Sequence, residues 1–480
     1  MSGQSLKFSL SYQTVYQVLN TIIPLITSPY LARVLGAEMQ GVFSYTQSIV
    51  NLFVLFSMLG VVNYGTRTVA SCLNNRELVS GIFWNIYIFQ AALSLFCIAL
   101  YSICIVSLFS SYKFVFLLQG IYLLGSLLDI NWLFFGLEKF KTTVTRSIFV
   151  RLISVVLILT LVNSKSDLWI YTIIMAGSTF VSNGILWLIA YKEIDLNCLR
   201  YIKLDEIIKH IKPNIILFIP ILGMSIYHIM DKTMLGVLSS YEEVGYYYNA
   251  DKVINIPVGI ISGIGTVMLP RMTSLLAEDK INESKKYLLL SLELTTAVSC
   301  ALAFGIASIS KEFTPFFFGN GFNSCVALMM VLSPVLIIKG FSSTARMQYL
   351  IPFHQEKIFI QSVFMGAFTN VIVNIVLIPK LGAMGAVIGT LVAEFISCFW
   401  QYFKIRKEDD VIKTLIKSAI YLLFGLIMFI IVRFASVLVN SNYESLLIEI
   451  GIGILVYSSL CFVFWKSTKN DILGILLKKI

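Results

Sequence analysis

Charged side chains lie inside stretches of this chain that are otherwise apolar and long enough to cross a membrane. An ionised group is costly in hydrocarbon, so such positions are candidates for ligand binding, ion coupling or charge pairing. Cations slightly outnumber anions among them, which favours an anionic ligand whose charges would otherwise have to be desolvated in the bilayer. The positions are Arg33, Asp129, Arg151, Asp231, Lys232, Asp251, Lys252, Glu293, Lys339, Glu394 and Arg433.

Eight residues within or at the ends of these stretches are predicted to contact such a ligand. Asp129 and Trp132 together suit sugar hydroxyls and a sugar face, although a boundary tryptophan is more often an interfacial anchor. Glu394 follows a run of small residues that favours close helix packing, so its side chain is expected to face protein or a cavity. Arg151 and Lys339 lie near enough to a boundary to reach the interface instead. The predicted contacts are Arg33, Arg67, Asp129, Trp132, Arg151, Arg271, Lys339 and Glu394.

Two adjacent charge pairs and one histidine are candidates for coupling transport to an ion. They are Asp231 with Lys232, Asp251 with Lys252, and His228. Only a short connection separates the two pairs, so both are expected in the external half of the membrane. Neighbouring helical residues point about 100° apart, so one member of each pair can face the partner helix and the other a cavity. The pairs are expected either to exchange partners during transport or to form a fixed ion-pair cluster. His228 is expected either to carry a proton or to be a hydrogen-bonded packing residue.

The elements that hold these residues are predicted to be membrane-spanning helices. Fourteen apolar stretches lie between residues 9 and 465, each close to the roughly 20 residues that a helix needs to cross hydrocarbon. The chain is 58% hydrophobic and 13% charged, with a mean hydropathy of +0.85. The first stretch, residues 9–35, is too long for the apolar core of a signal peptide and no cleavage site follows it. The sequence therefore predicts an all-α polytopic membrane protein.

The basic residues indicate how the chain is oriented in the membrane. Of 36 Lys and Arg residues, 26 fall in the segments on the same side as the amino terminus, 5 on the other side and 5 inside the stretches. The positive-inside rule then places both termini in the cytoplasm. The net charge of +10 follows from this topology, so a nucleic acid partner is not expected.

An internal repeat predicts two lobes. Residues 33–50 resemble residues 233–254, and the interval from Gly41 to Arg67 equals that from Gly245 to Arg271. Six stretches separate the copies, which gives both the same orientation in the membrane. The prediction is an amino-terminal lobe over 1–191, a cytoplasmic amphipathic linker or solvated loop over 192–212, a second lobe over 213–405, and two further helices with a tail over 406–480.

Five motifs in order carry a family resemblance. PYLARVLG (29–36), GVVNYGTR (60–67), DINWLFFGLEKF (129–140), DKTMLG (231–236) and VMLPRM (267–272) resemble the polysaccharide-transport branch of the multidrug/oligosaccharidyl-lipid/polysaccharide (MOP) exporters, nearest to Wzx-type O-antigen and capsule flippases. The resemblance implies a MATE-like fold of six, six and two helices. It also implies alternating access that carries undecaprenyl-diphosphate-linked oligosaccharide across the bacterial cytoplasmic (inner) membrane. Membrane lipids, a polysaccharide polymerase and a chain-length regulator are the partners it suggests.

One departure limits the resemblance. Lipid II flippases of the same superfamily carry arginines inside the first helix, whereas residues 11–30 contain no charge. The cationic cavity of that branch therefore does not transfer to this chain.

Other function classes fit the sequence less well. An ion-coupled multidrug exporter would share the fold. A membrane glycosyl-polymerase would be expected to carry a large external loop, whereas the longest predicted one is about fourteen residues. The three histidines have no catalytic or metal-binding spacing, the eight cysteines form no Cys-x-x-Cys pair, and the absence of any Gly-Lys dipeptide excludes a Walker A loop. The sequence predicts a transporter with no cofactor and no metal.

Overall fold

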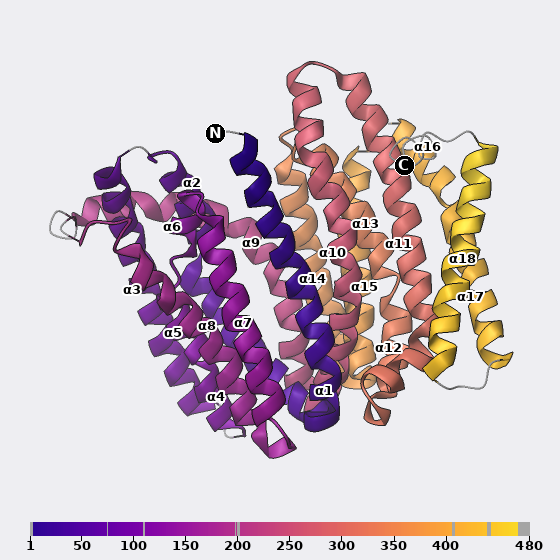
Figure 1. Cartoon of the computed structure of the whole chain (residues 1–480), viewed down its shortest axis with the longest axis horizontal. Helices are drawn as coiled ribbons and strands as arrows, with labels where there is room; N and C mark the ends of the chain where they lie inside the picture. The colour runs from indigo at the N-terminus through magenta and orange to yellow at the C-terminus, as the bar shows by residue number, and fades with distance from the viewer. Residues whose placement is uncertain are drawn as a thin grey trace. The chain divides into compact units, whose positions relative to one another are not determined.

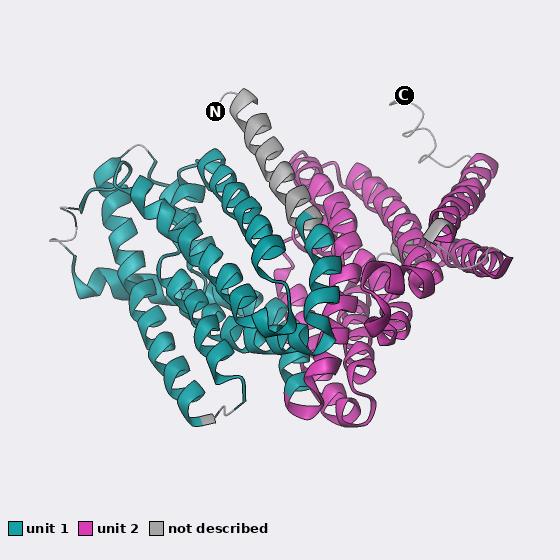
Figure 2. Ribbon diagram, turned by 60° about the horizontal axis from the view of Figure 1, so that its bottom comes forward, with its two compact units in different colours: residues 1–236 teal, residues 237–480 magenta. Residues whose placement is uncertain are grey.

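The computed structural model describes residues 3–73, 75–108, 111–196, 198, 202–405, 409–438 and 443–468. Within these residues every regular element is a helix (Figure 1). In this part of the chain, thirteen segments are long and apolar enough to cross a membrane, and the first of them, Ile23–Ala70, covers the second predicted stretch and the end of the first. The all-α membrane fold is therefore confirmed. By packing, the chain forms two compact units, residues 1–236 and 237–480 (Figure 2).

The described residues of the first unit form nine α-helices, and one membrane span, Lys113–Gly136, is divided among three of them. The helices are α1 (Gly3–Met58), α2 (Val61–Ala70), α3 (Arg76–Leu108), α4 (Lys113–Gln119), α5 (Ile121–Leu127), α6 (Asn131–Gly136), α7 (Phe140–Leu161), α8 (Leu168–Ala190) and α9 (Leu204–Leu238). Within α1, Gly36 has φ 74° and ψ 178°, a conformation that favours glycine and divides α1 into two predicted spans. Aromatic side chains from α3, α6 and α8 form much of the core of this unit.

The described residues of the second unit are also helical. Its α-helices are α10 (Tyr241–Ala277), α11 (Ile281–Phe317), α12 (Ser324–Leu332), α13 (Val335–Ala345), α14 (Glu356–Leu381), α15 (Ala383–Ile405), α16 (Asp409–Ser418), α17 (Ile420–Leu438) and α18 (Tyr443–Ser467). A π-helical segment, Arg346–Leu350, extends α13. The two last long helices, α17 and α18, pack against α11 around Tyr421, Met428 and Tyr457.

The segment predicted as an amphipathic linker is helical only in its second half. Residues 192–195 form turns, because the backbone N–H of Asp195 donates to Ser80 Oγ (2.8 Å) and its carbonyl accepts from Trp84 Nε1 (3.0 Å). The helix begins at Leu204 and continues without interruption as α9, whose Ile207 and Ile211 pack on the core of the first unit. Leu199 lies outside the described residues. The lobe boundaries and the cytoplasmic position of this segment stay predictions.

The two copies of the sequence repeat differ in backbone path. α1 ends at Met58, Leu59 has φ 41°, and Arg67 lies in the separate short helix α2. Arg271 instead lies inside α10, which continues to Ala277. The equal spacing therefore does not place Arg67 and Arg271 in the same local structure.

Candidate functional site

The span Lys113–Gly136 is broken near its end, between Leu127 of α5 and Asn131 of α6. A break within hydrocarbon frees backbone carbonyls, which then need donors from elsewhere. Side chains of α3 and α8 supply them. Gln90 Nε2 donates to the carbonyls of Ser126 (2.9 Å) and Asp129 (2.8 Å), Trp187 Nε1 to that of Leu128 (3.0 Å), and Asn183 Nδ2 to that of Gly125 (2.9 Å). The break is therefore held by side chains far away in the sequence.

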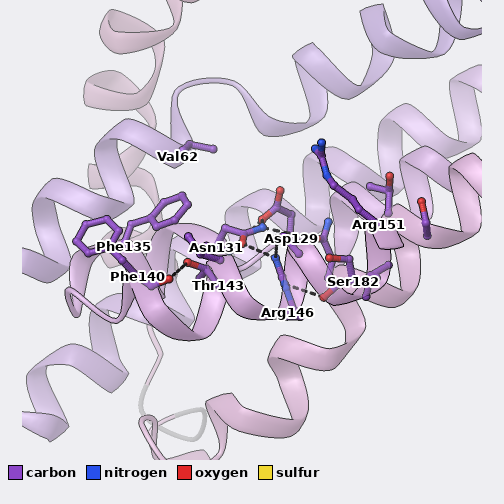
Figure 3. A pocket seen from close by; sticks show the side chains of 15 residues that line it. Val62, Asp129, Asn131, Phe135, Phe140, Thr143, Arg146, Arg151 and Ser182 are labelled. Carbon is purple, nitrogen blue, oxygen red and sulfur yellow. Dashed lines mark hydrogen bonds between the residues drawn. The ribbon is translucent and has the colours of Figure 1, made fainter. Parts of the chain in front are cut away.

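Arg146 of α7 joins this break to α8 (Figure 3). Its guanidinium donates from Nη1 to the Ser182 carbonyl (2.6 Å) and from Nη2 to Asn131 Oδ1 (2.9 Å). Asn131 in turn donates from Nδ2 to Asp129 Oδ1 (2.7 Å) and to Asn183 Oδ1 (3.2 Å). Arg146 is buried, so this network fixes one positive charge beside the carboxylate of Asp129.

A cavity of about 600 Å³ opens beside this network and is lined by α6, α7 and α8. This volume is within the range of about 300–1,000 Å³ that is usual for ligand pockets. Arg151 also lines it from α7, and in Figure 3 its guanidinium lies apart from the Arg146 network. Two arginines and one aspartate give the lining a net charge of +1. Its hydroxyl groups come from Thr143, Ser147, Ser178, Thr179 and Ser182.

This lining suits a ligand that combines phosphate with sugar. A guanidinium can bind two phosphate oxygens at once, and hydroxyl and amide groups can exchange hydrogen bonds with sugar hydroxyls. Arg146 and Arg151 both line the cavity, so either guanidinium can contact a phosphate there.

The structure brings two of the predicted contacts, Asp129 and Arg151, into this one cavity. Trp132 does not line it. Its side chain is fully buried, donates from Nε1 to Gln90 Oε1 (3.0 Å) and stacks on Phe83 with ring centroids 5.4 Å apart. The expectation that Trp132 meets a sugar face is therefore corrected to a packing role in this conformation.

Arg146 was missing from the predicted contacts. In the sequence it lies among polar residues just before an apolar stretch. It is therefore assigned to a cytoplasmic loop in the count of basic residues. In the structure α7 begins at Phe140, six residues before Arg146, so Arg146 lies within the helix. The available signal was the set of amides and hydroxyls inside neighbouring apolar stretches, including Asn131, Ser182 and Asn183.

The other arginines of the prediction lie elsewhere. Arg67 is exposed and lines a second cavity of about 620 Å³ with Lys212 and Tyr64, between α2 and α9. Arg33 is exposed on α1. In the second unit, Arg271 is exposed and lies 5.4 Å from the ring centroid of Tyr287.

Lys339 of α13 and Glu394 of α15 contact each other. Lys339 Nζ lies 3.5 Å from Glu394 Oε1, and the two side chains are 15% and 8% exposed. This places Glu394 against protein, as its small-residue neighbourhood predicts. The proximity also gives both residues a partner within the second unit.

The predicted ion-coupling residues lie on α9 and α10. Asp231 is fully buried and Lys232 half-buried on α9. On α10, Asp251 accepts from Asn255 Nδ2 (2.7 Å), and the Lys252 ammonium lies 4.6 Å from the ring centroid of Tyr248. The side chain of His228 lies outside the described residues. An exchange of partners between the pairs stays a prediction.

The described part of the chain offers no group of three or more His, Cys, Asp or Glu side chains that could hold a metal ion. All eight cysteines are free thiols.

Two family models match the chain. The one described as polysaccharide biosynthesis protein matches residues 8–276, and the one described as lipid II flippase MurJ matches residues 147–451. Two relatives each carry the name "Putative O-antigen transporter". The relative from Escherichia coli (strain K12) is 26% identical over 398 residues, which cover 81% of this chain and 94% of the relative. The relative from Shigella dysenteriae is 26% identical over 384 residues, which cover 78% and 93%.

Solved structures share the fold. The lipid II flippase MurJ in an inward closed conformation has a TM-score of 0.74 at 16% identity, over 95% of this chain and 99% of its own. An inward-facing multidrug resistance MATE transporter of the MOP superfamily has a TM-score of 0.56 at 12% identity, over 85% of this chain and 95% of its own. These likenesses confirm the predicted MATE-like architecture.

Proposed function

The chain belongs to the polysaccharide biosynthesis protein family, and from this premise we propose that it flips undecaprenyl-diphosphate-linked oligosaccharide repeat units across the bacterial cytoplasmic membrane. The products would serve O-antigen, capsule or exopolysaccharide biosynthesis. The chain is a multi-pass membrane protein with the fold of a lipid flippase. A polysaccharide polymerase and a chain-length regulator are proposed as its partners.

The observation that carries this proposal is the cavity beside the broken span. A diphosphate with several sugars is anionic and hydrated, and its passage through hydrocarbon would require the loss of many hydrogen bonds. The cavity offers guanidinium, amide and hydroxyl groups in their place. Asn131, itself bonded to Asp129, holds Arg146 within the span, and Arg151 adds a second guanidinium to the cavity lining.

The same lining favours a glycan flippase over a multidrug exporter. Two guanidinium groups repel organic cations, and the polar side chains along α7 and α8 suit a hydrated ligand better than an apolar one. The shared MATE-like fold does not by itself distinguish the two functions.

The test is export by an Arg151→Gln variant in a strain that lacks this gene. Loss of a hydrogen bond to a charged group typically costs about 1.5–3 kcal/mol, so surface glycan should fall about tenfold or more. The lipid-linked repeat unit should accumulate in the inner leaflet while the variant reaches normal abundance in the membrane. Arg151→Lys, which keeps the charge but not the planar fork, should restore part of the export.

Arg76→Gln is the matched control, because Arg76 is an exposed arginine that donates to the Tyr191 carbonyl (3.5 Å) and lies outside the cavity lining. It should export normally. Full export by Arg151→Gln at normal abundance would contradict the proposed role of the cavity. A changed resistance to organic cations with unchanged glycan export would favour the multidrug alternative.

A further inference from the structure

Three charged side chains lie on α11, α17 and α18, which pack together in the second unit; the cavity described above belongs to the first unit. They are Glu312 of α11, Arg433 of α17 and Glu449 of α18. Arg433 Nη1 donates to Glu312 Oε2 (2.8 Å) and to the Ser308 carbonyl (3.1 Å). The positive charge of Arg433 is therefore already matched by the carboxylate of Glu312.

Glu449 is the member of this cluster that lacks a matched charge. Its side chain is only 2% exposed, and among the described residues neither of its oxygens accepts a hydrogen bond. Among the described residues, the charged groups that act on it electrostatically are the carboxylate of Glu312 and the guanidinium of Arg433. If both glutamates were ionised, the cluster would carry a net charge of −1 in an apolar surrounding, which is costly.

The cluster lies close to one end of all three helices. Glu312 is five residues from Phe317, where α11 ends; Arg433 is five residues from Leu438, where α17 ends; and Glu449 is six residues after Tyr443, where α18 begins. At 1.5 Å per residue these positions lie about 8–9 Å from the helix ends. The cluster therefore lies less than two helical turns from that side, which the predicted orientation places outside the cell.

We propose that Glu312, Arg433 and Glu449 form a proton-binding site on the carboxy-terminal helices, in which Glu449 holds the proton. With one proton bound, the two carboxyl groups and the guanidinium sum to zero charge. Release of the proton leaves an unmatched carboxylate between α11 and α18. A low external pH, which keeps Glu449 protonated, therefore stabilises the packing of α17 and α18 against α11. A high external pH weakens this packing.

A proton fits this cluster better than a metal cation does. A hard cation takes six or more oxygen ligands, whereas the described residues show two carboxylates here, one of them already bound by Arg433. The guanidinium would also repel a second cation. A proton needs only one oxygen of Glu449.

The first experiment measures thermal stability of the purified full chain against pH. An acid that stays protonated in the folded chain but ionises in the unfolded chain makes the folded state bind more protons, so stability falls as pH rises. Between about pH 6 and pH 9 the Tm of the wild type should fall relative to Glu449→Gln by about 3 °C or more. Glu356→Gln, at an exposed position on α14, is the control and should follow the wild type.

The second experiment detects the proton directly by infrared difference spectroscopy. The wild type should show the carbonyl band of a carboxylic acid at neutral pH, Glu449→Gln should lose it, and Glu356→Gln should keep it. If Glu449→Gln does not fold, Glu449→Asp should shift the band instead of removing it. Absence of any band that depends on residue 449 would overturn the proposal. Stabilisation of the wild type by sodium or potassium chloride, but not by choline chloride, would overturn it in favour of an alkali cation.

These measurements use no glycan. The proton site and the proposed flippase function can therefore fail independently of each other.

Discussion

At the scale of single residues, charges inside the spans are neutralised by two different arrangements. Arg146 is held by a carbonyl and amides around a broken helix, whereas Lys339 and Glu394 face each other as a close pair. The first arrangement borders a cavity that Arg151 also lines. The second arrangement provides each charge with its counter-ion, so we expect it to stabilise the second unit.

Glu394→Gln tests this structural role. Removing one partner of a buried ion pair typically costs about 3–5 kcal/mol, because the other charge loses its counter-ion. The variant should therefore unfold at a lower temperature and reach lower abundance in the membrane. Neutralising the partner in Lys339→Met/Glu394→Gln should recover most of this loss, as measured by thermal unfolding in detergent.

The exposed Glu356→Gln serves as the control and should unfold like the wild type. The opposite outcome for Glu394→Gln would favour the prediction made from the sequence. If this variant is abundant in the membrane but does not export glycan, Glu394 contacts the ligand.

The sequence identified charged residues well but not their surroundings. Asp129 and Arg151 were predicted because a charge within an apolar stretch is visible in the sequence. Trp132 was misjudged because the sequence does not show that α2 and α3 cover its ring. Arg146 was missed because the start of α7 is polar, and only the fold brings Ser182 and Asn131 next to it.

At the scale of the elements, the sequence predicted the spans but not their interruptions. Hydropathy is averaged over about 19 residues, so a break of three residues between α5 and α6 leaves it unchanged. The break is stable because Gln90, Asn183 and Trp187 supply donors from α3 and α8. These partners are distant in the sequence, and no local pattern shows them.

Close contact between α2 and α6 should be needed to hold this broken span. A Cβ atom on Gly65 would lie 2.5 Å from Trp132 Cε3, and one on Gly136 would lie 2.6 Å from Val69 Cβ. Gly65→Ala and Gly136→Ala should therefore each lower stability by about 1–3 kcal/mol through overpacking. Thermal unfolding of the purified variants measures this loss.

Gly81→Ala is the matched control, because a Cβ atom there would meet nothing within 4 Å and alanine is the better helix former. It should be as stable as the wild type or slightly more so. Equal stability of Gly65→Ala and Gly81→Ala would show that α2 does not pack as closely on α6 as the structure indicates.

At the scale of the whole molecule, the orientation of the chain in the membrane is predicted from the distribution of its basic residues. The fold alone does not define this orientation. The fold gives the order of the spans among the described residues, whereas the side of the membrane at which each span ends is a prediction from the sequence. Which side is cytoplasmic depends on the 26 basic residues on one side against 5 on the other. If Arg67, Arg146 and Arg271 are left out of the count, 23 basic residues remain on that side against 5, which still satisfies the positive-inside rule.

Reporter fusions at alternate connections test this orientation. Fusions after Asn75, Lys203 and Lys407 should report the cytoplasm, and fusions after Ser110, Glu242 and Asn320 the outside. Lys203 is the most informative position, because it precedes α9 and follows six predicted spans. An external signal there would mean that the two copies of the repeat do not share one orientation. The proton site near the beginning of α18 would then face the cytoplasm, and the proton gradient would act on it with the opposite sign.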